Sequence, residues 1–397
     1  MTQAPPVPLH MQRDRFDPVE ELTRIRQDEG VRELETAFGA RAYLVTRHSD
    51  VREVLADATR FSNAGAFQPP EDERSEQQRE RDRAGMMLAF DPPEHTRLRR
   101  MLTPEFTVRR MRRLEPRIVE IVDEHLDAME RAGRPADLVA SFALPIPSLV
   151  ICELLGVPYA DRTEFQARTG RLLDLSITMD ERRELGRANQ AYMDELVARA
   201  RSAPGEDMLG MLVREHGDDL SSAELSGIGS LLLIAGHETT SNMLGLGTLA
   251  LLRHPDQLAL VRDDPAAAVP AVEELLRWLS IVHTGVLRTT TTEVEIAGHR
   301  IGAGELVLCA LPTANRDPEV LADPQRLDVR RGAPGHLAFG HGVHHCLGAP
   351  LARMEMRIAF PALLRRFPNL APAVPYEDIG FRAYHFVYGL HALPVTW

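Results

Sequence analysis

Residues 339–348 read FGHGVHHCLG, and a helical pattern with Pro350 in its expected first turn follows at once. Cys346 therefore stands at the entrance to a helix, where the helix dipole and the free backbone N–H groups favour negative charge. Both effects lower the pKa of a thiol. The position thus predicts a low-pKa thiolate, which is a good metal ligand.

Three kinds of chemical site could use this cysteine. Zinc needs three or four ligands, and one short loop rarely aims all of its candidates at one ion; they are His341, His344, His345 and Cys346. A catalytic thiol needs a positioned histidine base and an oxyanion site, which the sequence neither shows nor excludes. Haem iron can be held by a lone thiolate. An inert, buried cysteine is the remaining interpretation.

A second unusual stretch is a long helical pattern over residues 221–254. Ser221 and Glu224 have the spacing of a capping box, and no proline interrupts the pattern before Pro255. About 30 residues at 1.5 Å each give roughly 45 Å, enough to cross a whole domain. Its middle, AGHETT at residues 235–240, turns abruptly polar. This indicates either a functional site or a hydrated bend in which the threonines bond back to earlier carbonyl groups.

Most of the remaining chain also has a helical pattern. The segments with apolar residues at three- and four-residue steps are 105–132 (with Pro116 as a candidate break), 147–155, 181–201 and 350–366. The strand-like segments are 42–46, 292–301 and 305–310. Residues 63–83, with adjacent prolines and dense charge, predict a surface loop. The predicted fold class is mainly α with a small β region.

The composition excludes several classes of enzyme. All 46 basic residues are arginine, and the chain contains no lysine. Schiff-base enzymes, pyridoxal-phosphate enzymes, P-loop nucleotidases and protein kinases depend on a lysine, so none of these is expected. The net charge of −12 argues against nucleic-acid binding over the whole surface, because that affinity comes mainly from neutralised phosphates.

The cysteine count and the N-terminus bear on the cellular compartment. Cys152, Cys309 and Cys346 are too few and too scattered for a disulfide framework. Residues 1–20 combine prolines with mixed charges, where a signal peptide would need an apolar core. No apolar stretch approaches the roughly 20 residues that span a bilayer. We therefore expect a cytoplasmic protein without membrane contact.

The quoted loop resembles the haem-binding loop of the cytochrome P450 family, F-G-x-G-x-H-x-C-x-G. Every fixed position of that pattern is matched, by Phe339, Gly340, Gly342, His344, Cys346 and Gly348. The middle of the long helix resembles the family's oxygen-activating motif A-G-x-[DE]-T, through Ala235, Gly236, Glu238 and Thr239. The resemblance implies one cytochrome P450 domain over residues 1–397, with a helix-rich lobe, a small β-rich lobe and the long central helix over the haem.

A third match supports the same family. Glu274 and Arg277 resemble the family's E-x-x-R ion pair, and Arg326 would be its third member, all three with a structural role. Alone the pattern is weak, because ion pairs three residues apart are common on exposed helices. In this order along the chain the three motifs reinforce one another. Leu327 departs from the phenylalanine that the family commonly has at this place.

The resemblance also assigns the haem contacts. Cys346 would be the axial ligand of haem b, and its thiolate would push electron density onto the iron. The two propionates would be held by His95, Arg99, Arg288 and His344. The loop glycines would let the backbone approach the macrocycle. The remaining contacts would be Phe339, Gly340 and Gly348 on the cysteine side, and Ala235 and Gly236 on the opposite side.

On the side opposite the cysteine, the resemblance implies oxygen activation. Gly236 would make room for dioxygen in the central helix. Thr239 would hold the oxygen and a water, and Glu238 would deliver protons from solvent. His237 is expected at the surface, linked to solvent and not acting as a ligand.

The resemblance places a mostly apolar substrate pocket beside the haem. The candidate contacts are Leu231, Ile234, Val286, Leu287, Phe386 and Val387. Each of them could instead be an ordinary core residue. Residues 142–159 also resemble soluble bacterial members of the family that hydroxylate bulky, mostly apolar molecules such as macrolides, terpenoids and sterol-like compounds.

Together these features predict a haem-thiolate monooxygenase that inserts one oxygen atom of O2 into a small molecule, by hydroxylation or epoxidation. The alternative is a haem-thiolate protein that inserts no oxygen: an isomerase, a coupling enzyme or a gas sensor. The pair Glu238 and Thr239 favours the monooxygenase, because a sensor needs no proton relay. We expect a monomer that receives electrons from a ferredoxin and ferredoxin reductase, with NAD(P)H used only indirectly. The eight arginines within residues 97–117 would be the ferredoxin's docking patch.

Overall fold

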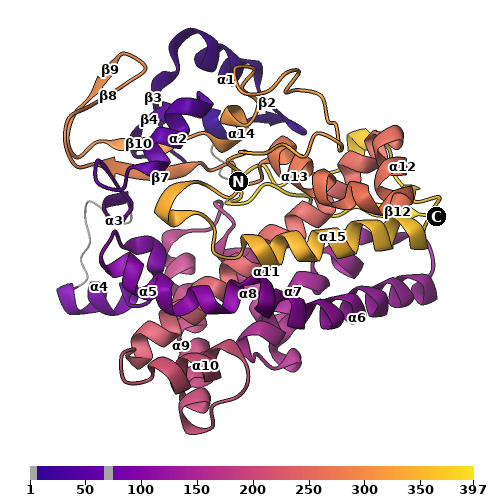
Figure 1. Ribbon diagram of the computed structural model, residues 1–397, viewed down its shortest axis with the longest axis horizontal. Helices are drawn as coiled ribbons and strands as arrows, with labels where there is room; N and C mark the ends of the chain where they lie inside the picture. Colours follow the sequence, from indigo (N-terminus) through magenta and orange to yellow (C-terminus); the bar gives the residue numbers. More distant parts are fainter. Residues whose placement is uncertain (1–6, 67–74) are drawn as a thin grey trace.

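The computed structural model describes residues 7–66 and 75–397, and its longest element is the 32-residue helix α11 (Ser222–Arg253) (Figure 1). The expected capping box is present: the Glu224 amide donates to Ser221 Oγ at 3.1 Å, and the Ser221 amide donates to Glu224 Oε2 at 2.8 Å. The helix ends at its C-cap, His254, immediately before Pro255. The predicted central helix is therefore confirmed at both ends.

Other helices pack around α11 and bury most of it. The helices α7 (Pro145–Leu155), α9 (Met179–Ser202) and α15 (Ala349–Arg366) all contact it. Close approach depends on glycine: a Cβ at Gly229 would come within 2.5 Å of the sulfur of Met193 on α9. Since α11 lies at the centre of the largest hydrophobic cluster, polar side chains in its middle are held in a rigid frame.

The remaining helices occupy both halves of the molecule in Figure 1, with α6 to α10 together in the lower half. Their bounds are α1 (Glu20–Arg24), α2 (His48–Ala56), α3 (Asn63–Ala66), α4 (Glu76–Arg83), α5 (Glu94–Leu102), α6 (Val108–Ala132), α8 (Arg162–Leu172), α10 (Met208–His216), α12 (Pro255–Asp263), α13 (Ala268–Leu279) and α14 (Leu311–Ala314).

The β structure is small and lies mostly in the upper half of Figure 1. A five-stranded sheet has the order β3 (Val31–Glu35), β4 (Arg41–Val45), β10 (Leu306–Cys309), β7 (Val286–Thr290) and β5 (Phe61–Ser62). Only the β4 and β10 pair within it is parallel. The smaller sheets are formed by β1 (Arg13–Asp14) with β2 (Asp17–Pro18), by β8 (Val294–Ile296) with β9 (His299–Ile301), and by β11 (Ala371–Pro372), β12 (Pro394–Thr396) and β6 (Ala136–Asp137).

The predicted elements agree with these bounds apart from two details. Helix α6 runs through Pro116, so the candidate break there is wrong. Pro116 is exposed, and the buried residues Ile118 and Ile121 beyond it anchor the helix to the core, which offsets the lost backbone hydrogen bond. The predicted surface loop, 63–83, begins and ends as the helices α3 and α4, and residues 67–74 lie outside the described part. Across the described ranges, no helix has the length and apolar character needed to cross a bilayer.

Candidate active site

The loop that carries Cys346 is a compact turn fixed by backbone bonds. The Cys346 amide donates to the carbonyl oxygen of Phe339 at 2.9 Å, and helix α15 begins three residues later. Gly342 has a φ of +72°, and a Cβ there would come within 2.3 Å of the Leu55 carbonyl oxygen on α2. This glycine therefore allows a close approach to α2, and its expected approach to a macrocycle stays a prediction.

The Cys346 side chain is exposed to the space in front of the loop. Desolvation by the surrounding protein nevertheless raises the pKa of its thiol, outweighing the N–H groups of Gly348 and Ala349 and the charges of Arg99 and Arg353. The expected lowered pKa is thus wrong for the free thiol. Metal binding itself deprotonates a cysteine ligand, so a raised pKa of the free thiol is compatible with a thiolate ligand.

Two histidines meet beside the loop. The rings of His95 on α5 and His344 have their centroids 4.1 Å apart. His95 is buried and His344 is half-buried, and none of their four ring nitrogens has a hydrogen-bond partner among the described residues. Burial, together with the charges of His95 and Arg288, lowers the pKa of His344 to about 3. Unpartnered ring nitrogens of this kind indicate a polar ligand, because burying them without one is costly.

Two arginines complete this group. Arg288 on β7 is 3% exposed and donates to Asn63 Oδ1 at 2.6 Å, yet it forms no ion pair within the described chain. Arg99 is half-buried and donates to the His345 carbonyl oxygen at 2.7 Å. A buried cation without a counter-charge destabilises a protein, so Arg288 is best explained by an anionic ligand. Asn63, which orients it, was not indicated by the sequence.

The residues present fit a haem. An open thiol stands at the N-terminus of α15, and a buried arginine lacking a carboxylate lies with Arg99 and two unpartnered imidazoles. Haem offers an iron for the thiolate and two carboxylates for the cations. The four predicted propionate residues are therefore brought together in one place, since His95, Arg99 and Arg288 all act on the pKa of His344.

The polar middle of α11 holds an acid next to a hydroxyl. Thr239 Oγ donates to the Ala235 carbonyl oxygen at 2.8 Å, the back-bond expected of a threonine in a helix. The Glu238 side chain is 4% exposed, and its Oε2 accepts from Arg382 Nη1 and from Asn242 Nδ2, each at 3.4 Å. Arg382 comes from the C-terminal segment, 144 positions along the chain, so its pairing with Glu238 could not be predicted from spacing.

One expectation for α11 is wrong. His237 is fully buried, with Nε2 at 3.0 Å from the Thr169 hydroxyl on α8 and Nδ1 at 2.6 Å from the Leu233 carbonyl oxygen, so it is not a surface residue. A Cβ at Gly236 would lie 2.7 Å from Ile151 on α7. A Cβ at Gly236 would therefore point at a neighbouring helix, and the room for dioxygen expected at this residue stays a prediction. The exposed residue of this turn is Ala235.

The E-x-x-R pair is present and buried. Arg277 donates to both Glu274 oxygens, at 2.7 and 2.8 Å, and to the carbonyl oxygens of Asn315 and Pro324. The predicted third member is wrong: the Arg326 side chain is 64% exposed and pairs with Asp328. The nearby cation is instead Arg331, 3.8 Å from Glu274. Arg326 and Arg331 stand five residues apart in one irregular segment. Sequence alone does not show which of them turns towards the buried pair.

The predicted substrate residues divide between two environments. Leu231, Ile234, Val286 and Phe386 are half-buried, as walls of a pocket would be. Val387 is 6% exposed and belongs to the core. Because side chains alternate along a strand, Leu287 faces away from Arg288 and packs against the cluster that contains Leu44 and Leu308. We keep the other four as candidates; Leu287 is half-buried as well, and contact of any of the six with a substrate stays a prediction.

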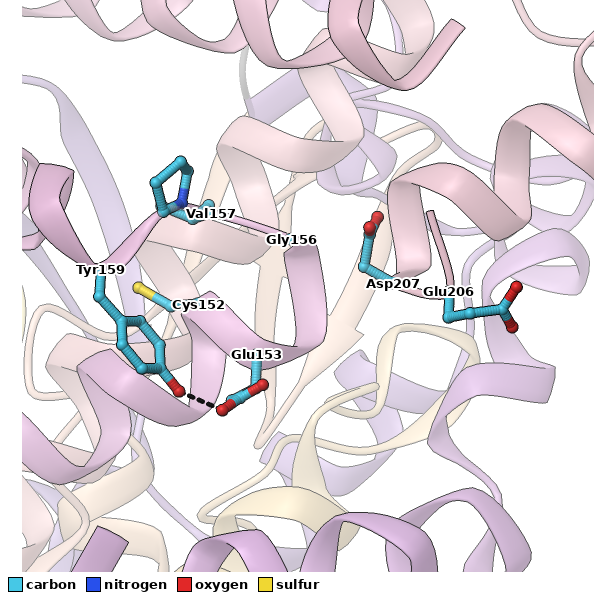
Figure 2. Close-up of a pocket in the computed structure, with 8 residues that line it drawn as sticks. Cys152, Glu153, Gly156, Val157, Tyr159, Glu206 and Asp207 are labelled. Carbon is cyan, nitrogen blue, oxygen red and sulfur yellow. Dashed lines mark hydrogen bonds between the residues drawn. The ribbon is translucent and has the colours of Figure 1, made fainter. Parts of the chain in front are cut away.

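A separate cavity of about 450 Å³ lies between the end of α7 and the start of α10 (Figure 2). Its wall includes Glu153, which accepts a hydrogen bond from Tyr159 and pairs with Arg117 at 2.7 Å. Cys152 beside it is buried, which raises the pKa of its thiol to about 12 and makes it inert. None of the predicted site residues lines this cavity.

Comparisons with known proteins agree with this geometry. The family model "Cytochrome P450" matches residues 267–380. Cytochrome P450 FAS1 of Rhodococcoides fascians is 50% identical over 394 residues, which cover 98% of each chain. The solved structure of P450 StaH from glycopeptide antibiotic A47934 biosynthesis is 45% identical, with a TM-score of 0.87 over 99% of this chain and 100% of that one.

A second solved structure, CYP105P1 in complex with filipin I, has a TM-score of 0.90 and 40% identity over 100% of this chain and 99% of that one. Its similarity and that of the relatives above extend well beyond the cysteine loop and include α11 and the sheet. The chain belongs to the cytochrome P450 family.

Proposed function

We propose that this cytochrome P450 monooxygenase inserts one oxygen atom of O2 into a bulky, mostly apolar natural product, by hydroxylation or epoxidation, with electrons from a ferredoxin. The observation that carries the proposal is the buried acid Glu238, which directly precedes the hydroxyl-bearing Thr239 in the sequence in the middle of α11. A buried carboxylate is costly even when it is paired, as Glu238 is with Arg382 and Asn242, and this favours a functional role for it. A gas sensor or an isomerase would need no such acid.

The residues of the chain would divide the work between two sides of the cofactor. Cys346 would ligate the iron of haem b, and His95, Arg99, Arg288 and His344 would hold its carboxylates. When bound, a thiolate-ligated haem supplies oxygen activation, because the thiolate favours O–O cleavage. These residues would therefore set the orientation of the cofactor as well as its reactivity.

On the α11 side, the hydrogen-bond directions suggest distinct roles for two residues. The Thr239 hydroxyl donates a hydrogen bond to the Ala235 carbonyl oxygen. Its oxygen lone pairs therefore remain free to accept a hydrogen bond from a water or another O–H group. Glu238 lies between Asn242 and Arg382, and the Arg382 side chain is 22% exposed. Glu238 would thus take protons from the solvent side and pass them towards Thr239.

The substrate class is argued from the half-buried candidates and from the relatives. The four candidates are Leu231, Ile234, Val286 and Phe386, and all are apolar. An apolar wall with few polar groups selects bulky apolar ligands by burial. The related CYP105P1 was solved with filipin I, and two further relatives are named pentalenic acid synthase and vitamin D(3) 25-hydroxylase. We therefore favour a macrolide, terpenoid or sterol-like natural product.

Docking of the ferredoxin is proposed at α5 and α6. Of the eight arginines predicted for this patch, the exposed ones without an ion-pair or hydrogen-bond partner in the described chain are Arg100, Arg109, Arg112 and Arg113. Arg110 instead pairs with Glu105 at 2.8 Å, and Arg97 pairs with Glu94 at 2.7 Å. The four free arginines would steer an acidic partner by opposite charge. We also propose that residues 1–397 form one domain that acts as a monomer.

The reaction class is tested by oxygen labelling. Apolar natural products that shift the absorbance of the ferric protein would first be selected as ligands, and each would then be incubated with a ferredoxin, its reductase, NADPH and isotopically labelled O2. The proposal predicts a product that carries one labelled atom. Rearranged or coupled product without the label, at normal electron consumption, would assign the protein to the class that inserts no oxygen.

A further inference from the structure

A second ion-pair cluster, distinct from Glu274 and Arg277, lies behind the cysteine loop. Arg353 on α15 donates to both oxygens of Glu273 on α13, at 2.7 and 2.8 Å. His336, just before the loop, lies 3.2 Å from the same carboxylate. Three segments that are separate in the sequence therefore converge on one carboxylate.

The cluster touches the loop through an aromatic ring. The guanidinium carbon of Arg353 lies 4.6 Å from the centroid of the Phe339 ring, a cation–π arrangement. Phe339 in turn accepts the amide of Cys346. Because Arg353 is held by two parallel hydrogen bonds, its place over Phe339 is well defined, and so is the backbone that presents the thiol.

The charges of the cluster do not cancel. Glu273 is ionised at neutral pH, because hydrogen bonds from His336 and Arg353 outweigh its burial and lower its pKa to about 2. Arg357 also lies 4.0 Å from it, so one carboxylate faces two guanidinium groups. The cluster is thus positive overall, and Arg353 is its member that reaches the cysteine loop, through the Phe339 ring.

We propose that Arg353, held by Glu273, is a positioning residue that fixes Phe339 and the thiolate loop and sets the reduction potential of the bound haem. The inference rests on Cys346 being the axial ligand, as proposed above. Positive charge near the metal stabilises the reduced, more negative state, and removing it favours the oxidised state. A change at Arg353 and a change at Glu273 should therefore act in opposite directions.

The test is the midpoint potential of the haem-loaded, substrate-free protein, measured by spectroelectrochemistry. Arg353→Gln should move the potential to more negative values, Glu273→Gln should move it to more positive values, and Arg353→Lys should leave it close to that of the wild type. The matched control is Arg366→Gln. Arg366 lies on α15 about 20 Å beyond Arg353 at 1.5 Å per residue, and the change breaks its ion pair with Glu130 on α6. It should not move the potential.

Opposite shifts cannot come from a loosened loop, which would move the potential in one direction for both variants. Shifts of the same sign, no shift in either variant, or an equal shift for Arg366→Gln would overturn the proposal. If Arg353→Gln does not retain haem, a shift to more positive potential in Glu273→Gln with little shift in Arg353→Lys supports the proposal, and no shift or a shift to more negative potential in Glu273→Gln overturns it. The reduced, carbon-monoxide-bound spectrum of each variant shows whether the thiolate ligand is kept, so a failure of Cys346 as ligand is distinguishable from a failure of this proposal.

Discussion

Arg277 binds both carboxylate oxygens of Glu274, and neither side chain is more than 3% exposed. The amide of Asp328 also donates to Glu274, at 3.0 Å, and Arg277 reaches the carbonyl oxygens of Asn315 and Pro324. The pair therefore ties α13 to the irregular segment that precedes the cysteine loop. Its role in the structure is to hold that segment in place.

Removal of one partner should be strongly destabilising. Glu274→Ala leaves Arg277 as a buried charge without a counter-charge, which typically costs about 3–5 kcal/mol. Urea unfolding should show this loss, and little haem-loaded protein should be recovered. Glu20→Ala, which breaks an exposed pair with Arg24, is the control and should cost less than about 1 kcal/mol. Normal stability of Glu274→Ala would show that the pair is not structural.

Oxygen use should depend on Thr239. Thr239→Ala removes the hydroxyl that would accept a hydrogen bond from a water on the oxygen side, so NADPH should still be consumed while product per electron falls and peroxide rises. The ratio of product to NADPH measures this. Thr248→Ala removes the same kind of back-bond on the same helix, 2.8 Å from the Leu244 carbonyl oxygen, and should leave the ratio unchanged. Unaltered coupling in Thr239→Ala would remove Thr239 from the mechanism.

Charge reversal on α6 should slow reduction by the ferredoxin. Arg112→Glu with Arg113→Glu changes two exposed arginines without partners in the described chain, a cleaner change than one at Arg110, which is paired. Stopped-flow reduction should be slower, and the loss should shrink as salt shortens screening to about 8 Å. Reversal of Arg187 and Arg300, also exposed, changes the net charge equally and should have little effect. Equal effects of the two pairs would rule out a local docking site.

Acid should destabilise the protein through His283. Its nitrogens lie 2.7 and 3.3 Å from the carbonyl oxygens of His385 and Met11, and burial, with a smaller effect of Arg13, lowers its pKa to about 3. The folded state favours neutral imidazole, so this contribution to stability is complete above an unfolded pKa of about 6.5 and is lost as pH falls towards 3. Between about pH 7 and pH 5 the loss should be about 2 kcal/mol.

The slope of unfolding free energy against pH measures this contribution. His283→Gln should flatten the slope in that range, while His299→Gln, at an exposed position on β9, should not. An unchanged slope in His283→Gln would assign the acid sensitivity to other groups.

Local sequence patterns predicted the parts of the site that are themselves local. The capping box of Ser221 and Glu224, the turn that ends at Cys346 and the i,i+3 pair of Glu274 and Arg277 are each complete within a few residues. Such patterns carry their own geometry, because helix and turn periodicity places the partners side by side.

Long-range partners could not be predicted in this way. Arg382 meets Glu238, Asn63 meets Arg288 and Arg353 meets Glu273 across 144, 225 and 80 positions. The prediction of Arg326 as the third member failed for the same reason, since tertiary packing decides that Arg331 is the arginine near Glu274. The buried state of His237 depends on α8, which no pattern around residue 237 reveals.

The central claim is that Cys346 is the thiolate ligand of a haem. The most direct measurement is the absorbance spectrum of the reduced, carbon-monoxide-bound protein, because only a thiolate-ligated haem gives the red-shifted Soret band for which the family is named. The wild-type protein should show that band, and Cys346→His should lose it even if haem is retained. The same band in Cys346→His, or its absence from the wild-type protein, would contradict the account.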